Sequence, residues 1–329
     1  MTGQNNAPVL AIDIGGTKMM AAVITSEGRM LASDVCPTRA DKGVSSIIER
    51  LFATIDELLG QDITEVSDPG GIGIACAGGI DTVMGMITQS PNLPGWHDVP
   101  LAEIVSERYK VDAYLINDAS AAALGEHRFG AGKGINNLVM ITLGTGIGGG
   151  IVINGELYLG AHGSAGEIGH MIIDVNGPPC ACGSNGCLES FASGKALARS
   201  AINRIKQGEE SSLSGMVEGR IDEITSEDVG AAAKDGDVLA LDVFSRAAYY
   251  LGIGLVNLVN IFNPEMIVLG GGMVEQFDLL IEPARQIMSE RAFKIAAQGV
   301  DIAAAQLGND AGVYGAAAYA IDQIKRRPK

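Results

Sequence analysis

Residues 8–24, PVLAIDIGGTKMMAAVI, place two apolar segments on either side of a glycine-rich turn. Apolar and β-branched residues flanking such a turn are typical of a β-hairpin. A similar unit recurs at residues 137–153, NLVMITLGTGIGGGIVI. Aligning the two units superimposes their first strands and places the loop that begins at Gly144 on the loop that begins at Gly15. Two such units predict an α/β fold with a duplicated lobe and a cleft between the copies.

Strands and helices alternate along the rest of the chain, as is typical of α/β folds. No Pro- or Ser-rich linker divides the sequence, so we expect two lobes joined by several crossings. We expect residues 1–118 plus about 305–329 to form a small lobe, and residues 119–304 to form a large one. Apolar periodicity predicts helices at about 42–60, 99–109, 119–129, 193–207, 225–234, 237–260, 276–290 and 310–325, and strands at 70–76, 111–116 and 265–272.

The net charge of the chain indicates which classes of partner it disfavours. The chain has 39 Asp and Glu against 23 Lys and Arg, which gives a net charge of −16. An acidic surface repels nucleic acid and anionic lipid. The first residues lack the basic and apolar regions of a signal peptide, and no stretch reaches 18 uninterrupted apolar residues. We therefore expect a cytoplasmic protein that binds neither nucleic acid nor membrane.

The second glycine loop, GTGIGG at 144–149, matches the glycine spacing of dinucleotide-binding loops. Those loops require a helix directly after the glycines, whereas residues 150–153 continue as an apolar strand. The chain also lacks a GxxxxGK[ST] segment. We therefore expect each loop to be a hairpin turn whose backbone N–H groups bind phosphate oxygens. For either loop alone, a tight turn without a ligand is the alternative.

Three of the five cysteines, Cys180, Cys182 and Cys187, lie within eight residues and follow His170. Three thiolates and one imidazole form a ligand set suited to tetrahedral zinc. Four protein ligands leave no open coordination position, so we predict a structural metal. Free thiols are the alternative, and the other two cysteines are expected to be simple buried thiols.

The chain resembles the ROK family of sugar kinases and repressors over nearly its whole length. The matching stretches are DIGGTK at 13–18, PNLPGW at 91–96, ND at 117–118, GTGIGGG at 144–150, GEIGH at 166–170, CACGSNGCLES at 180–190 and GGG at 270–272. The resemblance implies an actin-like ATPase (ribonuclease H-like) fold and ATP-dependent phosphorylation of a hexose or N-acetylhexosamine. Family repressors carry a helix-turn-helix segment before the first phosphate loop. Only twelve residues precede Asp13 here, so we expect a kinase.

Asp118 follows an apolar strand at its carboxyl end, where α/β folds bind their ligands. The resemblance implies that Asp118 is the catalytic base, which accepts the proton of the sugar 6-hydroxyl as that oxygen attacks the γ-phosphorus. An N-cap for the helix that starts at Ala119 is the alternative. The resemblance also assigns sugar contacts to Gly79, Asn92, Asn117, Asp118, Glu167, His170 and Glu189, with His170 contacting both the sugar and the zinc.

ATP, Mg²⁺ and structural Zn²⁺ are the cofactors that the resemblance implies. Asp13 would orient Mg²⁺ through water, and both glycine loops would contact the nucleotide phosphates. The resemblance thus assigns nucleotide contacts to Asp13, Gly15, Gly16, Thr17, Lys18, Gly144, Thr145, Gly146 and Gly148, with Gly271 and Gly272 beside the adenosine.

Glucose is the expected sugar, because CLESFASGKALAR at 187–199 is similar to the glucokinase branch of the family. N-acetylmannosamine, N-acetylglucosamine, fructose and mannose remain alternatives. A sugar-responsive regulator without catalysis is less favoured, since Asp118 and both phosphate loops are intact. The resemblance favours a homodimer or homotetramer.

Overall fold

The structure, a computed structural model, describes residues 7–61, 69–90 and 92–327. Pro91, the first residue of the stretch 91–96, lies outside this range. The chain forms two compact units: unit 1 consists of Met1–Asn136, Gly150–Gly166 and Ala305–Lys329, and unit 2 of Asn137–Gly149 and Glu167–Ala304. The chain therefore passes between the units four times.

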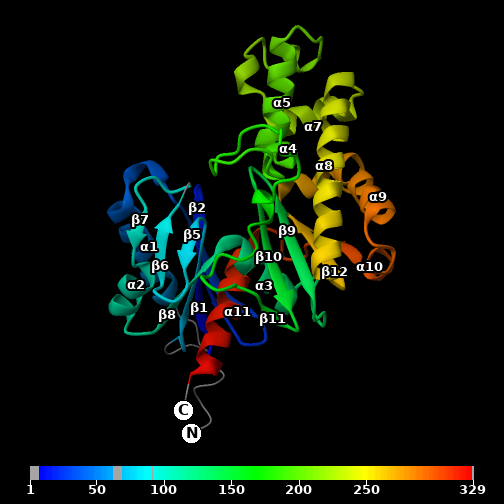
Figure 1. Ribbon diagram of the computed structural model, residues 1–329. Coiled ribbons are helices and arrows are strands. Elements are labelled where there is room, and N and C mark those ends of the chain that lie inside the picture. Colours follow the sequence, from blue (N-terminus) through cyan, green and yellow to red (C-terminus); the bar gives the residue numbers. More distant parts are fainter. Residues whose placement is uncertain (1–6, 62–68, 91, 328–329) are drawn as a thin grey trace. The chain divides into compact units, whose positions relative to one another are not determined.

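The units differ from the lobes expected from the sequence. Residues 119–136 and 150–166 belong to unit 1 and not to a large lobe. The physical reason is that α3 (Asp118–Phe129) packs closely against α11 (Ala311–Arg326), and Figure 1 shows α11 in red. A boundary after Asp118 would separate α3 from this packing partner.

Unit 1 is built on a five-stranded sheet with the order β3-β2-β1-β4-β8. The predicted hairpin is confirmed, because β1 pairs antiparallel with β2, and β4 and β8 run parallel to β1. Alternate β1 residues face opposite sides: Leu10 and Ile12 pack with α1 and α2, and Val9 and Ala11 with α3 and α11. The elements are β1 (Val9–Ile14), β2 (Lys18–Ile24), β3 (Met30–Pro37), α1 (Val44–Leu59), β4 (Ile72–Cys76), α2 (Leu101–Tyr109) and β8 (Ala113–Asn117).

A second, three-stranded sheet in unit 1 was not expected from the sequence. It consists of β5 (Gly79–Asp81), β6 (Met86–Gln89) and β7 (His97–Val99), in that order. Trp96 precedes β7 and is 0% exposed. It belongs to the apolar core beneath α1 and α2, which agrees with a packing role for this side chain.

The second large sheet has the order β11-β10-β9-β12-β13 and repeats the strand order of the first. In each sheet, the first three strands in sequence are followed by two parallel strands. This repetition confirms the duplication inferred from the two glycine hairpins. Residues Gly150–Ile153 and β11 of this sheet belong to unit 1. The strands are β9 (Leu138–Leu143), β10 (Ile147–Ile153), β11 (Glu156–Leu157), β12 (Met266–Gly270) and β13 (Asp301–Ala304).

Unit 2 packs its helices around α8 (Val238–Phe262). By length and composition α8 could cross a membrane, but 56% of its most apolar stretch is buried in the core. The helix predicted at 276–290 begins only at Glu282, after the π turn Phe277–Ile281, and Pro283 occupies its first turn. The other helices are α4 (Glu189–Ala192), α5 (Gly194–Lys206), α6 (Leu213–Met216), α7 (Ser226–Lys234), α9 (Glu282–Arg291) and α10 (Lys294–Gly299).

Candidate active site

Two carboxylates lie at the carboxyl edge of the unit 1 sheet. Asp13 stands near the end of β1 and Asp118 directly follows β8, and Cys76 at the end of β4 lies between their neighbours Ile14 and Asn117 in the sheet register. Burial and, second, the charge of Asp118 raise the pKa of Asp13 to about 7, although Lys18 opposes the shift. Burial also raises the pKa of Asp118. The two acids therefore share a poorly solvated environment that favours a proton or a cation.

Asn117, and not Asp118, caps helix α3. The Asn117 side-chain oxygen accepts hydrogen bonds from the amides of Ala119 (3.0 Å) and Ser120 (3.1 Å), and its Nδ2 donates to the Gly78 carbonyl (3.1 Å). Asp118 is the first helical residue, and its Oδ1 accepts from the Ala119 amide at 2.9 Å. The capping role that was the alternative for Asp118 thus belongs to its neighbour.

The first glycine loop is fastened by a residue that sequence reasoning missed. Thr38, which is 0% exposed, donates from Oγ1 to the Gly15 carbonyl (2.6 Å) and from its amide to the Thr17 carbonyl (2.8 Å). On the loop itself, the Gly15 amide donates to the Lys18 carbonyl at 3.0 Å. The loop is therefore held through its carbonyl oxygens. Thr38 directly follows β3, which pairs with β2 of the hairpin, and no local sequence pattern marks it.

Two glycines bring further chain segments against this loop and against Asp13. A Cβ atom on Gly16 would lie 3.2 Å from Asn92, so the predicted sugar residue Asn92 lies beside the first glycine loop. A Cβ on Gly312 would lie 2.5 Å from Asp13 Oδ2, so the start of α11 touches this carboxylate. Sequence reasoning missed Gly312. The signal was Asn309-Asp310-Ala311, which repeats Asn117-Asp118-Ala119.

The remaining predicted sugar residue of unit 1 is Gly79. Its carbonyl accepts a hydrogen bond from Thr88 Oγ1 at 2.9 Å, and the residue is exposed at the start of β5. Unit 1 thus carries Gly79, Asn92, Asn117 and Asp118. Glu167, His170 and Glu189 belong to unit 2.

In unit 2, Glu189 lies against the second glycine loop. Its Oε2 accepts a hydrogen bond from the Ile147 amide at 2.9 Å, and a Cβ on Gly146 would lie 2.3 Å from the same oxygen. Thr142 Oγ1 accepts from the Gly148 amide (3.2 Å), and the Gly194 amide donates to the Gly144 carbonyl (2.8 Å). Glu189 is therefore a partner of this loop and not a solvated surface acid.

Gly271 comes directly after β12 and closes on the end of β9. It has φ 91°, and a Cβ there would lie 2.3 Å from the Leu143 carbonyl oxygen. Leu143 immediately precedes the loop at Gly144. The two glycines assigned to adenosine, Gly271 and the exposed Gly272, thus lie next to the second glycine loop.

The four predicted metal ligands converge. The donor atoms of His170, Cys180, Cys182 and Cys187 all lie within 4.8 Å of one another. His170 contributes Nδ1, at 3.6 Å from Cys180 Sγ, and the sulfurs of Cys182 and Cys187 are 3.7 Å apart. Nε2 of His170 is thus left outside the cluster.

The cysteine thiols of this cluster differ in acidity. Desolvation opposes ionisation of Cys180, but hydrogen bonds from Cys182 and its other neighbours outweigh it and lower the pKa to about 7. Desolvation and the neighbouring thiols raise the pKa of Cys187 to about 12. Such a cluster cannot hold several thiolates unless a cation balances their charge.

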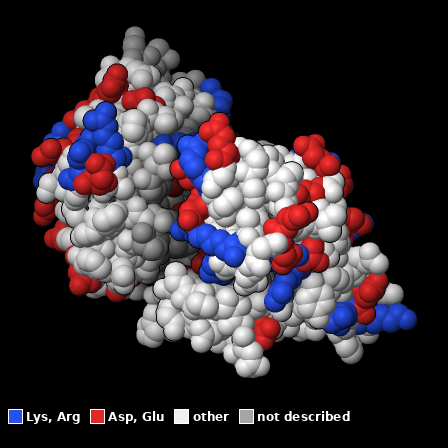
Figure 2. Space-filling view, turned by 90° about the horizontal axis from the view of Figure 1, so that it is seen from above, with Lys and Arg blue, Asp and Glu red and all other residues white. Residues whose placement is uncertain are grey.

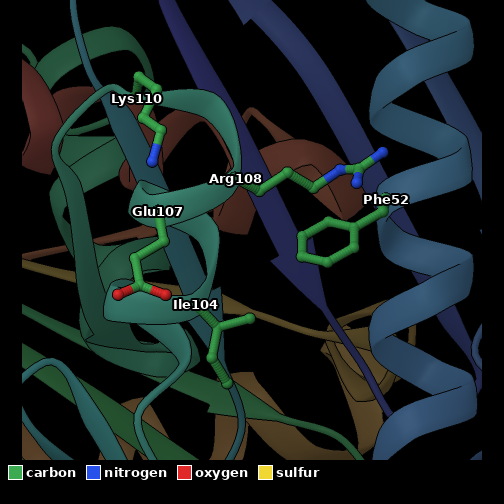
Figure 3. Close-up of a pocket in the computed structure, with 5 residues that line it drawn as sticks. All are labelled: Phe52, Ile104, Glu107, Arg108 and Lys110. Atoms are coloured by element: carbon green, nitrogen blue, oxygen red, sulfur yellow. The ribbon is translucent and has the colours of Figure 1, made fainter.

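A surface pocket of about 590 Å³ lies between α1 and α2 (Figure 3) and is lined by Phe52, Ile104, Glu107, Arg108 and Lys110. The Arg108 guanidinium lies 4.6 Å from the Phe52 ring centre and 2.5 Å from the Asp56 carboxylate. Helix α2 leads into the amino end of β8, whereas Asp118 follows its carboxyl end. The pocket is therefore at the opposite edge of the sheet from Asp118. Elsewhere on the surface, acidic and basic side chains are interspersed over the face that Figure 2 shows.

The sequence profile of the ROK family matches residues 9–323. The chain belongs to the ROK family. Its relatives include a glucokinase of Halalkalibacterium halodurans, 40% identical over 307 residues that span 93% of this chain and 92% of that protein. They also include a xylose repressor of Caldicellulosiruptor bescii, 32% identical over 321 residues that span 98% of this chain and 80% of the repressor.

Solved structures agree with this ROK assignment. A ROK family glucokinase from Streptomyces griseus, in complex with glucose and AMPPNP, superimposes with a TM-score of 0.78 at 36% identity and covers 96% of this chain and 99% of its own. This ROK protein therefore has the actin-like ATPase fold predicted from the sequence.

Proposed function

We propose that this ROK protein is an ATP-dependent glucokinase, which transfers the γ-phosphate of ATP to the 6-hydroxyl of glucose. The observation that carries the proposal is the half-buried Asp118 carboxylate, which lies with Asp13 at the carboxyl edge of the unit 1 sheet. Identity to glucokinases over nearly the whole chain supports glucose as the sugar.

In the proposed reaction, the Asp118 carboxylate accepts the proton of the 6-hydroxyl as that oxygen attacks the γ-phosphorus. The bond to the β,γ-bridging oxygen breaks, and the products are ADP and glucose 6-phosphate. The raised pKa of Asp118 supports this role, because a base with a higher pKa accepts a proton more readily. The residue must be ionised at the start, so turnover should fall in acid.

We assign to Asp13 the orientation of Mg²⁺ through water. When bound, Mg²⁺ offsets the charge of the β- and γ-phosphate oxygens. Asp13 fits this task, since burial and Asp118 raise its pKa to about 7 and a nearby cation would favour the ionised form. Phosphate contacts are proposed for Gly15, Gly16, Thr17, Lys18, Gly144, Thr145, Gly146 and Gly148, and adenosine contacts for Gly271 and Gly272.

Sugar contacts are proposed for Gly79, Asn92, Asn117, Glu167, His170 and Glu189. Three hydrogen bonds already use most of the Asn117 amide, so it has one N–H left for a sugar hydroxyl. Nδ1 of His170 lies in the thiol cluster, which leaves Nε2 for the sugar. Glu189 would use Oε1, because Oε2 accepts from the Ile147 amide.

A structural zinc ion is proposed at His170, Cys180, Cys182 and Cys187. Three sulfurs and one imidazole nitrogen within 4.8 Å of one another fit a tetrahedral ion. By fixing the His170 ring, the ion would orient a sugar ligand. Zinc content of one ion per chain, and its loss in Cys182→Ser, would support this site.

We further propose a cytoplasmic homodimer or homotetramer that binds neither nucleic acid nor membrane. The kinase proposal is tested by measuring kcat/KM of the purified protein with ATP and Mg²⁺ against glucose, mannose, fructose, N-acetylglucosamine and N-acetylmannosamine. Preference for an acetylated sugar would replace glucose with that sugar. No turnover of any sugar by zinc-loaded protein that still binds glucose would favour the sugar-responsive regulator, a role that the repressor relatives make a real alternative.

The matched test of the base is Asp118→Asn. We expect kcat to fall by about 10²–10⁴-fold, because the amide cannot accept the proton, while glucose affinity in calorimetry changes little. Asp112→Asn, at an exposed acid before β8, is the control and should retain near-normal kcat. Turnover of Asp118→Asn within a few fold of the unaltered protein would remove Asp118 from this role.

A further inference from the structure

Glu126 of α3 is a buried acid that the proposed reaction does not use. It is 0% exposed, and its two carboxylate oxygens accept separate backbone hydrogen bonds: Oε2 from the Ala131 amide at 2.8 Å and Oε1 from the Leu307 amide at 2.7 Å. A buried carboxylate is costly unless such bonds compensate it, and bonds to an ionised acceptor are stronger than neutral ones. The arrangement therefore ties two other chain segments to helix α3 through one side chain.

The two amides belong to segments that connect the units. Ala131 lies on the stretch that ends at Asn136, after which the chain enters unit 2. Leu307 lies just after the chain returns to unit 1 at Ala305. His127, the next residue of α3, lies with Nε2 2.8 Å from the Ile135 carbonyl. Burial lowers the pKa of His127, so the neutral ring donates this bond and fastens the first segment a second time.

Helices α3 and α11 also reach the two carboxylates of the candidate active site. Helix α3 begins at Asp118, and Gly312 of α11 touches Asp13. The helices approach backbone to backbone: a Cβ on Gly125 would lie 2.5 Å from the Ala311 carbonyl oxygen, and a Cβ on Gly315 would lie even closer to the Ala121 carbonyl oxygen. Glu126 directly follows Gly125, so its bond to Leu307 extends this contact to the segment that leads into α11.

We infer that Glu126 is a positioning residue, which holds the starts of α3 and α11 in register and thereby sets Asp118 relative to Asp13. The inference rests on the proposed kinase function for its consequence in catalysis, but not for the structural coupling itself. Glu126 is not a catalytic residue, because its carboxylate bonds to the backbone amides of Ala131 and Leu307 and it lies near the opposite end of α3 from Asp118.

The first test is Glu126→Gln, which keeps the shape but presents an NH₂ group to one of the two amides. The control is Glu156→Gln, which removes an exposed ion pair to Arg326 in the same unit and should be nearly neutral. We expect kcat of Glu126→Gln to fall by about 10-fold or more, since small displacements of reacting groups are costly, with KM for glucose within about 3-fold. A normal kcat in a folded but less stable variant would overturn the inference.

Gly130→Ala displaces the Glu126 carboxylate without changing Glu126 itself. A Cβ on Gly130 would lie 2.1 Å from Glu126 Oε2, so the side chain must move. Combined with Glu126→Ala, the glycine substitution should lose most of its effect on kcat, because its target has gone. Full additivity of the two effects would contradict the inference.

Hydrogen exchange separates this inference from the kinase proposal. In Glu126→Gln, we expect faster exchange both at the amides of Ala131 and Leu307 and at the distant starts of α3 and α11. This readout needs no substrate, so it holds even if no sugar is phosphorylated. Faster exchange confined to Ala131 and Leu307 would mean that Glu126 acts only locally, and would overturn the positioning role.

Discussion

The two glycine loops come from equivalent hairpins of the duplicated fold, and both are held through carbonyl oxygens, but only the second is also held by side chains that accept from its amides. Thr38 binds carbonyl oxygens of the loop at Gly15. Glu189 and Thr142 instead accept from amides of the loop at Gly144. When a loop is held through its carbonyl oxygens, its N–H groups are free to bind an anion. The Glu189 carboxylate beside the second loop would instead repel an anion.

The difference suggests that the two glycine loops have different roles. We propose that the first loop binds phosphate, while the second also fixes Glu189, which we propose as a sugar ligand. We therefore expect damage to the first loop to weaken ATP binding, and damage to the second to weaken glucose binding as well.

Among the changes that test the two loops, the largest expected effect comes from Gly146→Ala. The new methyl group would displace the Glu189 carboxylate, from which it would lie 2.3 Å. We expect KM for glucose to rise by about 10-fold or more, the cost of losing one charge-assisted hydrogen bond. Gly144→Ala is the control in the same loop, because its Cβ meets no atom within 4 Å. Equal glucose KM values for the two variants would break the proposed link between this loop and the sugar.

Thr38→Val should have a smaller and different effect. It leaves the Gly15 carbonyl without the Thr38 hydroxyl, at a cost of about 1–3 kcal/mol, and we expect a rise of several fold in KM for ATP with little change for glucose. Thr54→Val is the matched control: this buried threonine bonds to Arg50 and Cys36, away from the loop. It should lower stability without changing KM for ATP, and Thr38→Ser should behave like the unaltered protein.

The effect with the least bearing on the two loops concerns stability and pH. Since the pKa of folded Asp13 is about 7, against an ordinary value of 3.8, the folded state holds a proton that the unfolded state has lost. Stability without Mg²⁺ should therefore fall as pH rises from about 4 to about 7, by up to about 3 kcal/mol from this residue. Asp13→Asn should remove this contribution. Denaturant titrations of both proteins across that range measure it, and identical slopes would show that Asp13 does not titrate as described.

The sequence was most informative where its signals are local. Apolar residues around glycine turns predicted both hairpins, helical periodicity predicted most of the helices, and the spacing of His170 and the cysteines anticipated their convergence. Short strands such as β5 and β13 escaped, because three or four residues give too little periodicity to detect. Pro283 was overlooked in placing the helix start at 276.

Contacts between distant segments could not be predicted in the same way. Thr38 and Gly312 reach the site only once the sheet has formed, and neither has a distinctive local pattern. Helices α3 and α11 pack together as equivalent helices of the two copies, and the boundary expected after Asp118 wrongly separates them. Their shared Asn-Asp-Ala start was the one sequence signal of that relation. The roles of the individual site residues remain predictions.

Trp96 makes tryptophan fluorescence sensitive to one unit of the molecule and not to the other. It is the only tryptophan in the chain and lies buried in the core of unit 1. Intrinsic fluorescence therefore reports on unit 1, whereas circular dichroism reports on the helices of both units, including α8 of unit 2. If the two signals melt at different temperatures, the units unfold in separate steps, and a single melting temperature would not describe this protein.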